Sequence, residues 1–298
     1  MQIIEITRGN LKPIFHYWRA IGKDIPYFYK ATYQAFERSI FDDSHDGMSI
    51  FRDSKLFAAF EDSELKGFIQ YGLPNFHYSQ AGKITEGVDI GVVRNLYYDR
   101  ERPDIGRALL DLAFDYFKEN SLKDIYAFYH AMGMSSNGGH GKLHESFSYI
   151  GDLLFDVGFE LEHENIYYIC DMKERRIESP PNTYIKVERL DDSQQIFTLF
   201  DRDNNKLGNA QIKYIDRLIG SEQRDTVYLV WIGIDSKSRG QGLGTEFLDH
   251  ICDYFLLKGY RYLHTDTAID NRPAQSFYLK NQFVDCGITR SYIKKAKS

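Results

Sequence analysis

Residues Ile232 to Phe255 read IGIDSKSRGQGLGTEFLDHICDYF, and this stretch decides the fold class. The apolar run that leads into it, TVYLVWIGI (226–234), is rich in β-branched and aromatic residues and predicts a strand. Beyond the glycines the apolar residues recur at helical spacing, at Leu243, Phe247, Leu248, Ile251 and Phe255. A strand that enters a helix through a glycine-rich turn predicts a mixed α/β fold. It also predicts an anion site where the first amides of the helix lack carbonyl partners.

The composition indicates a globular chain with room for two domains. The 298 residues are 43% hydrophobic and 27% charged, and no run approaches the roughly 18 to 20 apolar residues that a membrane helix needs. The N-terminal segment MQIIEITRGN is too polar for a signal peptide, so we expect a cytoplasmic protein with no membrane partner. The net charge of -6 argues against a nucleic-acid partner. The spacing of Cys170, Cys252 and Cys286 predicts neither disulfides nor a zinc site.

The two halves of the chain resemble each other in order. GFELEHENIYYI (158–169) parallels QFVDCGITRSYI (282–293) at an offset of 124, which is 282 minus 158. Upstream, the segments that end at Phe117 and Phe255 are offset by 138, which is 255 minus 117. The first half therefore carries about 14 extra residues, and GMSSNGGHGKLHES (133–146) is the expected insertion. We expect that insertion to be a mobile loop.

Charges and a proline pair separate the halves. They predict a linker at 177–182, a first domain at 1–176 and a second domain at 183–298. Each half is expected to form a mixed, twisted sheet flanked by helices. The first half has room for helices over 11–41, whereas the second passes from its first strand almost directly into a hairpin that turns at 203–206.

The glycine loop resembles the pyrophosphate-binding motif of the GNAT superfamily, the acetyl-CoA-dependent N-acetyltransferases. The pattern is [QR]-x-x-G-x-[GA], and Arg239, Gly242 and Gly244 occupy its fixed positions. A Rossmann fingerprint would need glycine where Thr245 stands, and no G-K-[ST] follows as in a Walker A loop.

A second segment strengthens this resemblance. YLHTDTAIDNRPAQSFYLKNQF (262–283) is similar to the family's strand followed by N-x-x-A-x-x-x-Y-x-x-x-G-F. Asn271, Ala274, Tyr278 and Phe283 fall on family positions, while a glutamine stands at 282 in place of the usual glycine. Two motifs in the right order at the right distance make 183–298 similar to a GNAT domain.

The resemblance implies that acetyl-CoA is the acyl donor and that no metal is needed. Backbone groups of Ile232 and Ile234 would bind the pantetheine arm and the acetyl carbonyl, and Gly233 would mark the bulge at which the family separates its fourth and fifth strands. Loop amides would hold the pyrophosphate. The expected cofactor-binding residues are Ile232, Ile234, Arg239, Gly240, Gln241, Gly242, Leu243, Gly244, Thr245 and Asn271.

Acetyl transfer to an amine needs a proton acceptor for the amine and a proton donor for the leaving thiolate. Tyr278 occupies the family's general-acid position, and a phenol with a pKa of ~10 stays protonated at neutral pH. Simple packing is the alternative, since the chain has 22 tyrosines. Asp266 is the candidate base, with a surface carboxylate as the alternative. His264 is a weaker candidate on the same face of the strand.

The first half departs from the motif. Glu101 and Asp104 fall where the motif has its arginine and its first glycine, and Pro103 removes an amide donor. Leu154 stands at the position of Tyr278, so we expect no acetyl-CoA chemistry in the first half. We expect it to be a degenerate GNAT-like domain that helps to form the acceptor site or has a structural role.

Two function hypotheses remain open. The first is an N-acetyltransferase that passes acetyl directly from acetyl-CoA to a primary amine of a small molecule or peptide. The second is a non-catalytic acyl-CoA-binding or interaction protein with a GNAT fold. His140 and His144 have metal-ligand spacing only in a helix, and their glycine-rich setting favours a loop that covers the acceptor.

Overall fold

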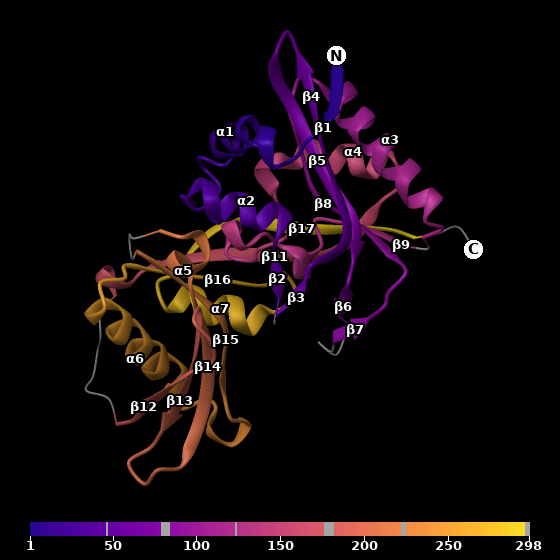
Figure 1. Ribbon diagram of the computed structural model, residues 1–298. Coiled ribbons are helices and arrows are strands. Elements are labelled where there is room, and N and C mark those ends of the chain that lie inside the picture. Colours follow the sequence, from indigo (N-terminus) through magenta and orange to yellow (C-terminus); the bar gives the residue numbers. More distant parts are fainter. Residues whose placement is uncertain (46, 79–83, 123, 176–181, 222–224, 296–298) are drawn as a thin grey trace. The chain divides into compact units, whose positions relative to one another are not determined.

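The computed structural model describes residues 1–45, 47–78, 84–122, 124–175, 182–221 and 225–295 (Figure 1). The chain forms two compact units. Unit 1 contains Met1–Glu164 and the chain from Ile288 onward, and unit 2 contains Asn165–Gly287.

Unit 1 is a mixed sheet between two helix layers. Its strands follow the order β1 (Gln2–Glu5), β4 (Phe51–Glu61), β5 (Glu64–Pro74), β8 (Ile90–Tyr98), β9 (Asp124–Ala127) and the part of β17 (Val284–Lys295) from Ile288 onward. β8 and β9 are parallel, and the other neighbours in this order are antiparallel. Figure 1 shows two helices on each side of the strands, α1 (Lys12–Ile21) and α2 (Tyr33–Phe41) on one, α3 (Pro103–Glu119) and α4 (Ser148–Asp156) on the other.

Short elements complete unit 1. β2 (Ser44–His45) pairs with β3 (Met48–Ser49), β6 (Phe76–Tyr78) pairs with β7 (Ile84–Glu86), and β10 (Leu143–His144) pairs with β17. Short 3-10 turns lie at Arg8–Asn10, His130–Met132, Ser135–Asn137 and Glu145–Phe147. α1 and α2 confirm the helices expected between 11 and 41.

Unit 2 repeats the plan without early helices. Its strands follow the order β12 (Tyr184–Arg189), β13 (Gln194–Phe200), β14 (Lys206–Tyr214), β15 (Thr226–Ile234), β16 (Tyr262–Ala268) and the part of β11 (Glu160–Asp171) from Asn165 onward. The helices are α5 (Ile215–Ile219), α6 (Leu243–Leu257) and α7 (Arg272–Lys280), with 3-10 turns at Met172–Glu174 and Ser236–Ser238. The hairpin between β13 and β14 is confirmed.

The core of unit 2 lies between its sheet and α6. Phe247, Leu248, Ile251 and Phe255 are each 0% exposed and belong to one buried cluster with residues of β13 to β16. Burying an apolar side chain of this size contributes about 1.5–3 kcal/mol, so the helical stripe read from the sequence is what holds α6 on the sheet. Among the described residues, no helix is both long and apolar enough to cross a membrane.

The internal repeat is visible in the helices, but the units do not end where the repeats end. α7 begins 124 residues after α4, which is 272 minus 148. Residues 165–175, expected in the first domain, lie in unit 2, and residues 288–295, expected in the second, lie in unit 1. A repeat identifies equivalent strands but not the sheet that each one joins. Residues 177–181 of the expected linker lie outside the described residues.

The insertion at 133–146 is packed into unit 1, contrary to the expectation of a mobile loop. A Cβ on Gly133 would lie 2.2 Å from the Gly139 carbonyl oxygen, and one on Gly141 would lie 2.3 Å from that of Tyr129. This backbone contact requires glycine. His144 lies in β10 and His140 packs against the ring of Tyr27, and no cluster with metal-ligand geometry occurs among the described residues.

Candidate active site

β15 contains a β-bulge, and beside it β15 and β16 separate. Consecutive residues of β14 pair with Leu229 and Trp231, which leaves Val230 as the extra residue. Gly233 pairs regularly with Asn209, so the bulge expected at Gly233 is instead at Val230. Nothing lies within 4 Å of a Cβ built on Gly233, so packing does not require glycine there.

Thr265 bridges β15 and β16 at the point where they part. The parallel pairing runs from Thr226 and Tyr262 to Tyr228 and His264. One residue further, the Thr265 hydroxyl donates to the Leu229 carbonyl at 2.9 Å. Thr265 is 1% exposed, so this hydrogen bond is made inside the unit.

Tyr278 reaches this point from α7. Its ring is 5% exposed and packs at centroid distances of 5.6 Å from Tyr168 and 5.2 Å from Phe283. Burial raises the pKa of Tyr278, a hydrogen bond with the Thr265 side chain lowers it in part, and the charge of Asp266 raises it further. Tyr278 therefore combines a packing role with a protonated hydroxyl at the separation of β15 and β16.

Asp266 lies on the opposite face of β16 from Thr265, because side chains alternate along a strand. Its carboxylate accepts hydrogen bonds from the Asn165 amide and the Tyr228 hydroxyl. The two candidate catalytic residues thus flank β16 from opposite sides. Sequence reasoning missed Asn165 and Tyr228, because they come from β11 and β15, whose pairing with β16 is not local.

His264 shares the face of Asp266. It is 6% exposed, and its Nδ1 lies 3.0 Å from the Tyr167 hydroxyl. Burial lowers the pKa of His264 to about 3, because the imidazolium cannot be solvated there. A neutral imidazole with so low a pKa is a weak proton acceptor at neutral pH.

The glycine loop is open where an anion would bind. Gly240 and Gly242 have φ angles of 78° and 80°, and no atom lies within 4 Å of a Cβ built on either. Gly242 is the N-cap of α6, whose 15 residues align their peptide dipoles toward this end. The Thr245 amide already donates to the Gly242 carbonyl at 3.0 Å, so the open amides are those from Gln241 to Gly244 within the part of the chain described.

Arg239 and Gly244 support the loop. The Arg239 Nε donates to the Ile234 carbonyl at 2.9 Å, which ties the loop to the end of β15. A Cβ on Gly244 would lie 3.1 Å from the ring of Phe277, so glycine at this position permits the close approach of α6 and α7. Ile232, whose backbone was expected to contact the donor, pairs with β14 beyond the separation from β16.

Asn271 has a structural task. Its side-chain oxygen accepts from the Ala274 amide at 3.3 Å and its amide donates to the Thr267 hydroxyl at 3.2 Å, so it caps α7. Its expected contact with the cofactor stays a prediction. The loop as a whole fits a pyrophosphate, because it combines open amides, a helix N-terminus and the exposed guanidinium of Arg239.

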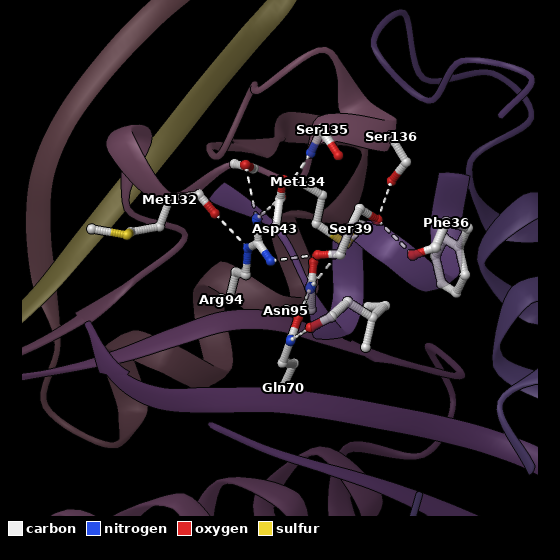
Figure 2. Close-up of polar contacts among 12 residues, drawn as sticks. Phe36, Ser39, Asp43, Gln70, Arg94, Asn95, Met132, Met134, Ser135 and Ser136 are labelled. Carbon is white, nitrogen blue, oxygen red and sulfur yellow. Dashed lines mark hydrogen bonds and ion pairs between the residues drawn. The ribbon is translucent and has the colours of Figure 1, made fainter. Parts of the chain in front are cut away.

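Unit 1 has the same bulge but fills it. β8 begins 136 residues before β15, which is 226 minus 90. The extra residue of the bulge in β8 is Arg94, which is the counterpart of Val230 in β15. Figure 2 shows the Arg94 guanidinium among acceptors from three segments. It donates to the carbonyls of Met132 at 2.6 Å and Ser39 at 2.7 Å, and it pairs with the Asp43 carboxylate.

The expectation that unit 1 lacks the acyl-donor site stays a prediction, and two features of unit 1 bear on it. The Arg94 side chain is 1% exposed, so it occupies the space beside the bulge. α3 begins at Pro103 without a glycine loop, and its N-cap is Arg102. The sequence gives no local signal for Arg94, because its acceptors lie far away in the chain.

Comparison with known proteins identifies the class. Residues 161–283 match the acetyltransferase (GNAT) family, so this part of the chain is a GNAT acetyltransferase domain. A curated relative, the L-2,4-diaminobutyric acid acetyltransferase of Shouchella clausii (strain KSM-K16), is 24% identical over 90 residues. The match covers 29% of this chain and 51% of the relative, so the chain spans about half of that relative's length.

Solved structures support the fold of the whole chain. A tandem GNAT protein from the clavulanic acid biosynthesis pathway has a TM-score of 0.66 at 10% identity, with 100% of this chain and 99% of that chain covered. A GCN5-related N-acetyltransferase from Sphaerobacter thermophilus has a TM-score of 0.65 at 10% identity, with 100% and 96% covered. The chain has the tandem GNAT fold, as the sequence predicts.

Proposed function

We propose that unit 2 transfers an acetyl group from acetyl-CoA directly to a primary amine of a small molecule. The observation that carries the proposal is the placement of Tyr278. Its buried hydroxyl lies beside the Thr265 side chain where β15 and β16 separate, and Asp266 lies on the other face of β16. A proton donor and a proton acceptor on opposite faces suit an amine that enters on one side and a thiol that leaves on the other.

The donor would be held by residues at the end of β15 and the start of α6. Amides from Gln241 to Gly244 and the Arg239 guanidinium would bind the pyrophosphate, with Gly240 and Gly242 allowing its approach to the backbone. When bound, acetyl-CoA supplies the activated thioester. Ile232 and Ile234 would present backbone groups to its pantetheine arm.

The proton chemistry falls to two side chains. Tyr278 would hold a transferable proton at its Oη, because burial keeps the phenol neutral. Asp266 would take a proton from the amine at its carboxylate. An alkyl ammonium with a pKa of ~10.4 costs roughly 4.6 kcal/mol to deprotonate at pH 7, so a carboxylate acceptor is useful here. No acyl-enzyme is needed.

The curated relative and Asp266 both support one acceptor class as the first to test. Since that relative is named for L-2,4-diaminobutyric acid, a small diamino acid is the first acceptor to test. The carboxylate of Asp266 would attract its ammonium group. A peptide amine is the second acceptor to test.

The test is an assay of the purified full chain with acetyl-CoA and L-2,4-diaminobutyrate, in which released thiol and acetylated product are both measured. Turnover that falls in a Tyr278→Phe variant would support the proposal. Acetyl-CoA binding without turnover on any small amine would favour the non-catalytic acyl-CoA-binding protein instead.

A further inference from the structure

Unit 1 contains a cavity directly after β8, at the place in the repeat where unit 2 has its glycine loop. The cavity has a volume of about 580 Å³ and opens to solvent between α1, the turn from β4 to β5 and the first turn of α4. This volume lies within the range of small-molecule sites, about 300–1,000 Å³. Its lining consists mostly of aromatic and charged side chains, whereas the glycine loop of unit 2 presents backbone amides.

One wall is aromatic and rigid. The Tyr98 hydroxyl donates to the Tyr149 carbonyl at 3.2 Å, and the Tyr149 hydroxyl donates to the Tyr98 carbonyl at 2.9 Å. The rings meet edge to face at 5.2 Å. Burial raises the pKa of Tyr149 to about 12, so this wall stays uncharged. Tyr98 is 1% exposed, so the surface that this wall offers is that of Tyr149, extended by Ile21.

Two of the lining cations are already neutralised. Lys66 lies 2.8 Å from Glu64 and 3.6 Å from Asp99, and Asp99 also accepts from the Tyr17 hydroxyl at 3.0 Å. Arg102 pairs in the same way with two carboxylates, those of Glu61 and Asp104. Among the lining residues these pairs match two cations with two carboxylates, Glu61 and Asp99, while Glu64 and Asp104 add negative charge outside the lining.

Arg100 and Glu101 differ from these pairs. Both are exposed and both line the cavity, and neither has an ion-pair partner in the described part of the chain. The Arg100 guanidinium lies 5.8 Å from the centroid of the Tyr149 ring, which holds it against the aromatic wall. The cavity therefore presents one uncompensated cation and one uncompensated anion beside an apolar surface.

We propose that this cavity binds a zwitterionic α-amino acid with an apolar side chain. The ligand's carboxylate pairs with Arg100, its ammonium pairs with Glu101, and its side chain packs on Tyr149 and Ile21. A phosphate is disfavoured, because Glu101 and Asp99 would repel it. The site is separate from the one proposed in unit 2 and does not depend on it.

The test is isothermal titration calorimetry of the full chain with L-phenylalanine, phenethylamine and 3-phenylpropionate. The two analogues lack the carboxylate and the ammonium, respectively. We expect saturable binding of phenylalanine that is about tenfold tighter than that of either analogue, equivalent to about 1.4 kcal/mol. Failure to saturate at about 10 mM phenylalanine, or equal affinity for the three compounds, overturns the proposal.

Substitutions at the two charged residues test whether phenylalanine binds in this cavity. Arg100→Gln and Glu101→Gln should each weaken phenylalanine binding about tenfold, as expected for the loss of one charged contact. The matched controls, Arg107→Gln and Asp111→Asn, change exposed charges on α3 and should bind normally. Binding that persists in Arg100→Gln and Glu101→Gln but is lost in Asp266→Asn would assign the amino acid to unit 2 and overturn the proposal. Acetyl-CoA titrations of the same variants test the donor site independently.

Discussion

Arg94 and Val230 occupy the same position in equivalent strands, and each is the extra residue of a β-bulge. In unit 2 the position carries an apolar side chain, and β15 and β16 are no longer paired beside it. In unit 1 it carries a guanidinium bonded to the chain's own carbonyls. One duplicated feature therefore serves a candidate site in one unit and a buried polar network in the other.

Replacing Arg94 with the residue of its counterpart should destabilise unit 1. Arg94→Val leaves the Asp43 carboxylate, which is 9% exposed, without its cation, together with buried carbonyls that lose their donor. We expect the free energy of unfolding to fall by about 3–5 kcal/mol, measured by urea denaturation. Arg107→Val on the exposed face of α3 is the control and should stay within about 0.5 kcal/mol of wild type.

Removing the Tyr278 hydroxyl should slow catalysis far more than it affects folding. Tyr278→Phe keeps the packing with Tyr168 and Phe283 but removes the proton donor. We expect kcat to fall by about 10² or more, with KM for acetyl-CoA little changed, in steady-state assays. Tyr168→Phe, which alters a neighbouring core phenol, should retain activity. Equal activity of the two variants would show that Tyr278 only packs in the core and does not donate a proton in the reaction.

The carboxylate of Asp266 and its donor Tyr228 should act together. Asp266→Asn should lower kcat/KM by about 10² or more, because the amine loses its proton acceptor. Tyr228→Phe removes one hydrogen bond to the carboxylate and should cause a smaller loss. In a double-mutant cycle, Tyr228→Phe should have little further effect once Asp266 is replaced. Additive losses would contradict a shared role.

The positive φ angle of Gly242 permits a direct test of the glycine loop. Gly242→Ala should cost about 1–2 kcal/mol of backbone strain and weaken acetyl-CoA binding at least about tenfold, measured by calorimetry. Gly259 is the matched control, since its φ is 87°, no atom lies within 4 Å of its Cβ position, and it follows the C-terminal end of α6. Gly259→Ala should cost similar stability and leave binding unchanged. If both variants bind acetyl-CoA normally, the loop is only a turn.

The burial of His264 should make the protein less stable in acid. Its pKa is lowered to about 3 in the folded protein, whereas an unfolded histidine titrates near 6.5, so the unfolded state binds the extra proton between these values. The contribution of neutral His264 to the free energy of unfolding is therefore present above pH 6.5 and is lost as the pH falls toward 3. The loss is about 2 kcal/mol at pH 5. His264→Gln should show a smaller loss of unfolding free energy between pH 7 and pH 5 in urea titrations. An identical pH dependence in the variant would exclude this origin.

Much of the site could be predicted because its signals are local. The helical stripe of α6, the glycines before it and the spacing from Asn271 to Tyr278 all lie within short segments, and short segments determine helices, caps and turns. Thr265 could have been added by the same reasoning, because strand alternation places it on the face opposite Asp266. The bulge was placed three residues too late, at Gly233 instead of Val230, because it depends on pairing with β14.

The sequence by itself determined that the chain is a duplicated mixed α/β protein with a glycine loop at one helix N-terminus. It also indicated that the first copy lacks that loop. Only the tertiary structure decided that the last strands join sheets other than those of their own repeats, and that Arg94 fills the first bulge. Strand pairing and buried ion pairs join residues that lie far apart in the chain. Equivalent sequences can therefore specify the same strand without specifying its neighbour.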